Sequence, residues 1–324
     1  MDLETFLAEW HDDNPTVLVH TSGSTGKPKP MYVEKRRMEA SARITCSFLG
    51  LHEGDTALLC MPLDYIAGKM MVVRALTCGL HLVSVRPSGQ PQWEGPVRFA
   101  AMVPLQVWNL LHNEEGCRRL RQIDHLIIGG GAIDDALAAL LRDFPNHVWS
   151  TYGMTETLSH IALRRLNGQE RSDWYTPFEG VTVALSDEGC LTINAPAVHD
   201  GLLQTNDIAE LDGRHFRILG RKDNVICSGG IKIQIEEVER LLHPRLTQPF
   251  MITKAPDTKF GEQVVLLTES NDVAALQTVC RQVLPKFWQP RRYITVSQLP
   301  MTATGKPARK DAELLAQRAI TQNE

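Results

Sequence analysis

Ten residues near the start of the chain combine the side chains and the backbone freedom that bind a polyphosphate. Residues 21–30 read Thr-Ser-Gly-Ser-Thr-Gly-Lys-Pro-Lys-Pro and follow a short apolar run at residues 16–19 that predicts a buried strand. Gly23 and Gly26 allow a tight turn that points backbone N–H groups at an anion. A Walker loop needs four residues between its glycines and Ser or Thr after the lysine. Only two residues separate these glycines and proline follows Lys27, so that alternative fails. A flexible surface turn is the other alternative for the loop alone.

Four further motifs follow in order: Thr-Tyr-Gly-Met-Thr-Glu at 151–156, Gln-Thr-Asn-Asp at 204–207, Gly-Arg-Lys-Asp-Asn-Val-Ile-Cys-Ser-Gly-Gly at 220–230, and Pro-Met-Thr-Ala-Thr-Gly-Lys-Pro-Ala-Arg at 300–309. Each motif alone is weak to moderate. Together with the loop, and in this order, they resemble the adenylate-forming superfamily, which contains acyl-CoA synthetases, luciferases and peptide-synthetase adenylation domains. The resemblance runs from Val17 to near the C-terminus.

The resemblance implies an ATP site built from the loop and the second motif. Thr155 would contact the α-phosphate, Glu156 would hold Mg²⁺, and Tyr152 would pack its ring on adenine beside Gly153. Without the motif, Glu156 would be an ordinary solvated carboxylate and Tyr152 a core aromatic. The loop residues that would bind the phosphates are Thr21, Ser22, Gly23, Ser24, Thr25, Gly26 and Lys27.

The resemblance implies that the remaining motifs supply the ribose contacts and a mobile lysine. Asp207 and Arg221 would bind the ribose, and Asp223 would be a hinge. Lys306 would reach the α-phosphate and the substrate carboxylate when a lid closes, which suits a charge on a mobile loop. Each of these residues could instead be a plain surface charge. The segment expected beside adenine is Gly130, Gly131 and Ala132, and the segment expected along the path of CoA is Ser228, Gly229 and Gly230.

The implied reaction activates a carboxylic acid. The acid attacks the α-phosphorus of ATP, pyrophosphate leaves, and the acyl-adenylate then accepts the thiol of CoA. Three segments are most similar to o-succinylbenzoate–CoA ligases of menaquinone biosynthesis, in a short form: Met-Pro-Leu-Asp-Tyr-Ile-Ala-Gly at 61–68, Gly-Gly-Gly-Ala-Ile-Asp at 129–134 and Tyr-Gly-Met-Thr-Glu-Thr at 152–157. That acid has a second carboxylate, which needs a fixed cation or donor. The candidates are Tyr65, Lys69, Arg74, Ser159, His160 and Arg164.

Three alternatives remain open at this point. The chain could be a ligase for another small acid, a standalone adenylation enzyme, or a non-catalytic nucleotide-binding relative. For the candidate cations the alternative is a surface charge, and for His160 it is a core histidine with satisfied hydrogen bonds.

Composition limits the other partners. The chain has 324 residues and a net charge of −4, so it presents no strong field for nucleic acid or anionic membranes. No apolar run approaches the length of about 18–20 residues that a membrane helix needs. The seven cysteines form no Cys-x-x-Cys pair, so we expect a cytoplasmic protein without disulfides or zinc. The oligomeric state is not predicted.

The pattern of elements predicts an α/β fold with a mixed, partly parallel sheet covered by helices, followed by a small α+β lid. We place the adenylation domain at 1–220 and the lid at 221–324. The N-terminal subdomain of the family is expected to be absent, because only about twenty residues precede the phosphate loop. Strands are predicted at 16–19, 56–61, 81–85, 99–103, 125–128, 250–254, 263–269 and 293–296, an antiparallel pair within 180–195, and helices at 3–10, 34–49, 134–144, 235–242, 273–283 and at the C-terminus.

Overall fold

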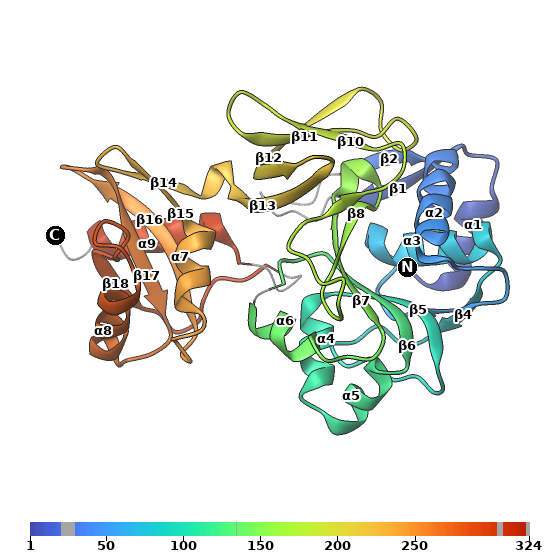
Figure 1. Ribbon diagram of the computed structural model, residues 1–324, viewed down its shortest axis with the longest axis horizontal. Coiled ribbons are helices and arrows are strands. Elements are labelled where there is room, and N and C mark those ends of the chain that lie inside the picture. Colours follow the sequence, from blue (N-terminus) through green and yellow to red (C-terminus); the bar gives the residue numbers. More distant parts are fainter. Residues whose placement is uncertain (21–29, 134, 303–306, 322–324) are drawn as a thin grey trace.

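The structure is a computed structural model that describes residues 1–20, 30–133, 135–302 and 307–321 (Figure 1). Its centre is a seven-stranded sheet with the order β4-β3-β5-β6-β7-β8-β9. The strands from β4 to β7 are parallel, and β8 and β9 are antiparallel to their neighbours. Their bounds are β3 (Thr56–Leu59), β4 (His81–Ser84), β5 (Val97–Met102), β6 (Ile123–Ile128), β7 (His147–Gly153), β8 (His160–Arg165) and β9 (Thr176–Pro177).

Helices cover this sheet, and their ends follow local sequence signals. The side chain of Asp2 caps the first helix by accepting a hydrogen bond from the Thr5 N–H at 2.8 Å. Gly50 ends the second helix with a φ of 61°, the left-handed conformation that glycine adopts readily. The helices are α1 (Leu3–His11), α2 (Lys35–Leu49), α3 (Ile66–Cys78), α4 (Pro104–Leu111), α5 (Glu114–Leu120) and α6 (Asp135–Leu141).

Two antiparallel sheets lie beside the main sheet (Figure 1). The strands β1 (Thr16–His20) and β2 (Pro30–Glu34) form a pair. A four-stranded sheet has the order β10-β11-β12-β13. Its strands are β10 (Thr182–Leu185), β11 (Cys190–Asn194), β12 (Leu202–Asp212) and β13 (His215–Arg221).

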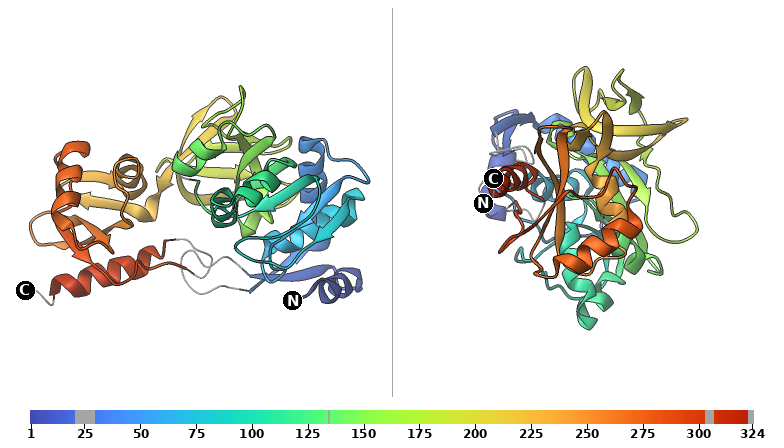
Figure 2. Two further views of the ribbon diagram at one scale, coloured as in Figure 1. Left: turned by 90° about the horizontal axis from the view of Figure 1, so that it is seen from below. Right: turned by 90° about the vertical axis from the view of Figure 1, so that its left-hand side faces the viewer.

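The chain beyond β13 packs around apolar clusters of its own. One buried cluster contains Ile226, Val238 and Leu266, whereas the main cluster ends at Phe216. The two parts lie side by side in the left view of Figure 2. The C-terminal elements are η2 (Lys222–Asn224), β14 (Val225–Ser228), β15 (Ile231–Gln234), α7 (Ile235–Leu242), β16 (Phe250–Asp257), β17 (Gly261–Thr268), α8 (Val273–Val283), β18 (Arg292–Thr295) and α9 (Arg309–Thr321).

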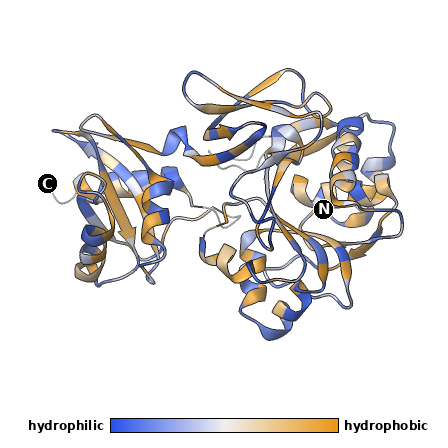
Figure 3. Cartoon of the chain, viewed as in Figure 1, coloured by the Kyte–Doolittle hydropathy of each residue, from blue (hydrophilic) through white to orange (hydrophobic). Residues whose placement is uncertain are grey.

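The predicted mixed α/β architecture is confirmed, with a sheet that contains parallel strands and is covered by helices. Apolar stretches follow the strands of both parts (Figure 3). The helices α3, α4 and α5 were not among the predicted elements. Among the described residues, no helix combines the length and apolarity needed to cross a membrane. The division into an adenylation domain and a lid stays a prediction.

Candidate active site

The carboxyl ends of the parallel strands bring two sequence motifs to one edge of the sheet. Ile128, the last residue of β6, pairs with Ser150 of β7, so the segments that follow these strands are neighbours. A Cβ atom on Gly129 would lie 2.2 Å from the Thr151 hydroxyl oxygen, so only glycine fits there. Gly130 then turns with a φ of 78°. The Gly130–Ala132 segment thus leaves the sheet at the edge where ligands bind in open α/β folds.

A chain of hydrogen bonds joins β7 to the end of β13. The Tyr152 hydroxyl donates to Asp207 Oδ2 at 2.6 Å. Arg221 donates to Asp207 Oδ1 at 3.3 Å and to Asp223 Oδ2 at 3.1 Å. Asn206 donates its side-chain amide to Asp223 Oδ2 at 3.2 Å. Three of the motifs identified in the sequence therefore meet in one polar group.

Aromatic rings surround this polar group. The ring centroid of Tyr152 lies 5.0 Å from that of Phe216 and 5.8 Å from that of Tyr175. Burial, followed by the nearby Asp207 carboxylate, raises the pKa of Tyr152, so the phenol keeps its proton and remains a donor. Sequence reasoning missed Tyr175 and Phe216, because neither lies in a motif and they join this cluster only through tertiary packing.

A sharp reversal follows β7. The short helix η1 (Thr155–Thr157) ends at Leu158, which has a φ of 63°, a rare value for a leucine. The Ser159 N–H donates to the Thr157 carbonyl at 2.7 Å, so Leu158 is the centre of a γ-turn. Gly153 is required beside this turn, because a Cβ there would lie 2.4 Å from the Ser159 carbonyl oxygen. The reversal sends the chain directly into β8.

Glu156 stands exposed on this turn, and Thr155 is buried beneath it. Among the residues that the structure describes, Glu156 has no ion pair, and no group of three or more His, Cys, Asp or Glu side chains could hold a metal. This donor set fits Mg²⁺, which proteins often bind through one or two carboxylates together with substrate phosphates.

The reversal also places two polar residues against a buried arginine. Arg74 of α3 is only 2% exposed and donates from Nη2 to Ser159 Oγ at 2.5 Å. Ser159 Oγ lies 3.1 Å from His160 Nδ1, and His160 Nε2 lies 3.3 Å from Thr45 Oγ1. Thr45 donates its own hydroxyl proton to the Ser41 carbonyl at 3.0 Å. The four side chains of Arg74, Ser159, His160 and Thr45 thus form a continuous network, in which only Ser159 is partly exposed.

The directions of these hydrogen bonds assign the proton of His160. Ser159 accepts from Arg74, so its hydroxyl is free to donate to Nδ1, and Thr45 can only accept from Nε2–H. The imidazole is then neutral, with its proton on Nε2. Burial, followed by the charge of Arg74, lowers the pKa of His160 well below its ordinary value, in agreement with this assignment.

The charge of Arg74 has no acidic counterpart in the described part of the chain. Nη1 contacts only the sulfur of Met71 at 3.7 Å, and Nε is buried without a hydrogen-bond partner. The ring of Phe99 lies 5.9 Å from the guanidinium carbon. Burial lowers the pKa of Arg74 to about 10, so the group remains charged at neutral pH. A buried guanidinium with an unused Nε donor and no carboxylate partner can bind an anion that reaches it.

The other candidates for the second carboxylate have different surroundings. Lys69 is buried, but its ammonium pairs with Glu9 of α1 at 3.0 Å and lies 4.9 Å from the ring centroid of Phe6, so it fixes α1 to α3. Arg164 pairs with Asp173 at 3.2 Å. Both cations therefore already have a carboxylate partner, and their predicted role toward the substrate stays a prediction. Tyr65, the residue before α3, is 39% exposed.

Several predicted site residues cannot be placed in this description. The loop residues 21–27 and Lys306 lie outside the described residues. Ser228 ends β14, and Gly229 and Gly230 form the turn to β15 in the C-terminal part, away from the network around Asp207 (Figure 1). Their predicted roles stay predictions.

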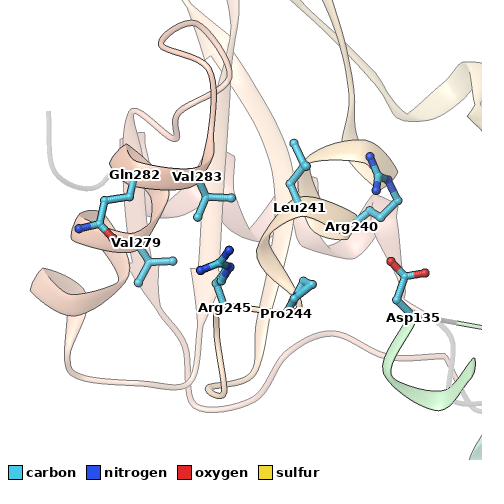
Figure 4. A pocket seen from close by; sticks show the side chains of 8 residues that line it. All are labelled: Asp135, Arg240, Leu241, Pro244, Arg245, Val279, Gln282 and Val283. Carbon is cyan, nitrogen blue, oxygen red and sulfur yellow. The ribbon is translucent and has the colours of Figure 1, made fainter. Parts of the chain in front are cut away.

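A cavity of about 670 Å³ lies between the two parts of the chain (Figure 4). Asp135 of α6 faces it from one side and Arg240 and Arg245 from the other. Arg240 already pairs with Glu237 at 2.5 Å. No predicted site residue lines this cavity, so it does not extend the network described above. Its remaining lining residues are Leu241, Pro244, Val279, Gln282 and Val283.

Comparison with known proteins bears on the family of the chain. The profile of the family described as "AMP-binding enzyme" matches residues 4–198. The 2-succinylbenzoate–CoA ligase of Salmonella typhimurium is 29% identical over 311 residues, which cover 90% of this chain and 67% of that protein. The chain thus spans about two thirds of the length of this curated relative.

Two solved structures show the same fold. An acyl-CoA synthetase (AMP-forming)/AMP-acid ligase II-like protein from Dyadobacter fermentans is 32% identical, with a TM-score of 0.65, over 96% of this chain and 92% of its own. The o-succinylbenzoate CoA synthetase of Bacillus subtilis, solved with ATP and a magnesium ion, has a TM-score of 0.73 at 24% identity, over 90% of this chain and 68% of its own. The matched profile and these relatives confirm the resemblance found in the motifs: the chain belongs to the AMP-binding enzyme family.

Proposed function

We propose that the protein is an AMP-forming acid–CoA ligase that acts on 2-succinylbenzoate. Its 2-succinylbenzoate–CoA ligase relatives and the order of its motifs support the reaction class. At 29% identity the relatives do not fix the acid, so the substrate is argued from the residues of this chain.

Adenylation needs ATP held rigidly while the carboxylate approaches its α-phosphorus, and the network around Asp207 suits that task. The carboxylate of Asp207 accepts hydrogen bonds from Tyr152 and Arg221, which hold it still, and its remaining lone pairs can accept ribose hydroxyls. The aromatic cluster offers a flat wall for adenine. Thr155 and Glu156 follow on the same strand end, within reach of the phosphates. Mg²⁺, held by Glu156 and the phosphates, would neutralise charge on the leaving pyrophosphate.

The buried charge of Arg74 is the observation that carries the choice of acid. A monocarboxylic acid needs no cation beyond those at the reacting end. A diacid brings a second carboxylate, and Arg74 provides a desolvated guanidinium with free donors next to the turn that bears Thr155 and Glu156. The neutral His160 and Ser159 orient it without competing for the anion. We therefore assign Arg74 to the ring carboxylate of 2-succinylbenzoate.

We also propose that residues 221–324 form a lid that turns about Asp223 between the two half-reactions. The separate apolar clusters on either side of η2 support this division. Lys306 would act in adenylation, and the turn at 228–230 would line the path of the CoA thiol.

Thioester formation tests the function directly. The protein is incubated with 2-succinylbenzoate, ATP, Mg²⁺ and CoA, and the thioester and pyrophosphate are quantified. We expect both products in equal amounts. Pyrophosphate release without a thioester would identify a standalone adenylation enzyme. Activity with other small acids but none with 2-succinylbenzoate would refute the substrate assignment.

A further inference from the structure

The residues proposed to bind the nucleotide are divided between two sheets. Tyr152 lies on β7 of the seven-stranded sheet, whereas Asp207 and Arg221 lie on β12 and β13 of the four-stranded sheet. The Tyr152 hydroxyl donates to Asp207 Oδ2 at 2.6 Å, and a hydrogen bond of this length forms only while the two sheets keep one spacing. A residue that fixes this spacing therefore acts on the nucleotide without touching it.

Tyr175, the residue before β9, joins the two sheets through its backbone. Its N–H donates to the Phe216 carbonyl at 2.7 Å, and its carbonyl accepts from the Phe216 N–H at 3.2 Å. The two residues form an antiparallel bridge that lies outside the regular strand pairing. Phe216 belongs to β13, and both β9 and β13 are edge strands. The bridge thus ties the edge of one sheet to the edge of the other.

The side chain of Tyr175 adds a second tie. Its hydroxyl oxygen lies 2.8 Å from that of the buried Ser150, which stands two residues before Tyr152 on the same face of β7. Its ring stacks on the ring of Phe216, with centroids 5.4 Å apart and an angle of 21° between the planes. The ring of Tyr152 lies against both of these rings, with centroids 5.8 Å from Tyr175 and 5.0 Å from Phe216. The ring proposed to pack on adenine is therefore supported by a residue that is fixed to both sheets.

Arg164 of β8 holds the segment that contains Tyr175. It lies opposite Ser150 in the pairing of β7 with β8, and its guanidinium carbon is 5.4 Å from the centroid of the Tyr175 ring. The same guanidinium pairs with Asp173 at 3.2 Å and donates to the Ser172 carbonyl at 3.5 Å. A cation on an aromatic face stabilises the position of the ring. The position of Tyr175 is thus set by β7, β8 and β13 together.

We propose that Tyr175 is a positioning residue, which holds Tyr152 and Asp207 at the spacing that the adenosine part of the nucleotide requires. This inference rests on the proposed function, in which Tyr152 packs on adenine and Asp207 accepts the ribose hydroxyls. Tyr175 acts through Tyr152 and through the spacing of the sheets. Its loss should therefore weaken AMP and ATP by the same factor and spare the acid, which we assign to Arg74.

Calorimetry on the full chain without acid, with AMP and with ATP plus Mg²⁺, measures this effect. Tyr175→Leu removes a hydrogen bond and an aromatic contact, each worth a severalfold change in affinity, so the Kd of both nucleotides should rise about tenfold or more. Tyr175→Phe loses only the contact with Ser150, and both Kd values should rise about fivefold.

The matched control is Phe144→Leu, which removes another buried ring with a guanidinium on its face. The guanidinium carbon of Arg121 lies 4.5 Å from the Phe144 centroid. Phe144 precedes β7 and so lies at the opposite end of this strand from Tyr152. The control should lower the urea midpoint of unfolding yet leave both Kd values within twofold, which separates loss of stability from loss of nucleotide binding.

A double comparison with Ser150→Ala tests the contact between the two hydroxyl groups. Ser150→Ala should weaken both nucleotides as Tyr175→Phe does, and the double variant should be no weaker than either single variant, because one contact is lost in all three. Additive losses would overturn the tie through Ser150. In pyrophosphate release, the KM for ATP should follow the Kd, whereas the KM for 2-succinylbenzoate should stay within twofold.

The outcomes separate this inference from the function on which it rests. Unchanged Kd values in Tyr175→Leu, a loss for ATP without an equal loss for AMP, or an equal rise in the KM for the acid overturns the positioning role and leaves the ligase function standing. If Tyr175→Leu does not fold, unchanged Kd values in Tyr175→Phe overturn it. A wild type that binds both nucleotides but forms no thioester refutes the ligase function, while the calorimetric comparison still decides the role of Tyr175. A wild type that binds neither nucleotide refutes both.

Discussion

Replacing Arg74 by methionine should separate the stability of the fold from recognition of the substrate. The guanidinium is buried, has no acidic partner among the described residues, and makes its one strong hydrogen bond to Ser159. Methionine has a similar length, carries no charge, and would lie next to Met71 and Phe99. We expect a folded protein that no longer holds the ring carboxylate.

The two effects of this substitution on the free energy of unfolding nearly cancel. Lowering the pKa of Arg74 from 12.5 to about 10 corresponds to roughly 3 kcal/mol of unfavourable burial. The lost hydrogen bond to Ser159 is worth about 1.5–3 kcal/mol because its donor is charged. The free energy of unfolding should therefore change by less than about 1.5 kcal/mol. Arg74→Ala also removes the packing of a long side chain, which costs about 2–5 kcal/mol in a core.

The effect of the substitution on the affinity for the diacid has no such compensation. A carboxylate that enters a desolvated site without its partner loses about 3–5 kcal/mol, which is more than a hundredfold in affinity. The analogue 3-benzoylpropionate, which is 2-succinylbenzoate without its ring carboxylate, should lose little. The KM for ATP should stay within about twofold, because Arg74 does not touch the group around Asp207.

The assay is a double comparison of protein and substrate. Urea unfolding gives the stability of the wild type, Arg74→Met and Arg74→Ala, and pyrophosphate release gives the KM of each acid for the wild type and Arg74→Met. Equal losses for the two acids, or a methionine variant destabilised by more than 3 kcal/mol, would refute the assignment of Arg74 to the second carboxylate.

Three further predictions concern the nucleotide, the lysine and pH. Asp207→Asn should weaken ATP binding by about 2–3 kcal/mol, since a charged acceptor is lost, and an unchanged Kd by calorimetry would reduce Asp207 to a turn residue. Lys306→Ala should abolish adenylation yet spare thioester formation from presynthesised acyl-adenylate, and comparable loss of both half-reactions would contradict its proposed role. Burial, followed by the neighbouring His147, lowers the pKa of His125 to about 4 in the native protein. In the unfolded chain His125 has its ordinary pKa of 6.5, so between these two values the unfolded chain binds a proton that the native protein does not bind. Stability should therefore fall by about 2 kcal/mol between pH 7 and pH 5, and urea unfolding at the two pH values should show a smaller fall in His125→Asn.

The elements with strong local signals could be predicted from the sequence. The helix at 235–242 and the helix at 273–283 have the predicted bounds, and Gly50 ends α2 as expected. The helix α3 was harder, because residues on all of its faces are buried and the amphipathic pattern is lost. Its burial on every side follows from packing against other elements, which no local window contains.

The candidate site also contains residues that the sequence could predict and residues that it could not. The motif residues Tyr152, Asp207 and Arg221 could be chosen from the sequence because their types and order are specific. The ranking of the four cations could not be predicted, since the ion pair of Lys69 is with Glu9, a residue sixty positions away. The contact of Phe260 with the turn at Gly229 could not be predicted either, because it arises from strand pairing between β14 and β17.

Arg221 joins Asp207 in β12 to Asp223 in η2, which is the predicted hinge residue. A ligand that draws the Asp207 carboxylate toward itself changes how strongly Arg221 holds Asp223, and so changes the free energy of bending at that point. Thermodynamic linkage makes this relation reciprocal. If the nucleotide changes the equilibrium between two orientations of residues 224–324 by some factor, the change of orientation must alter the binding constant of the nucleotide by the same factor.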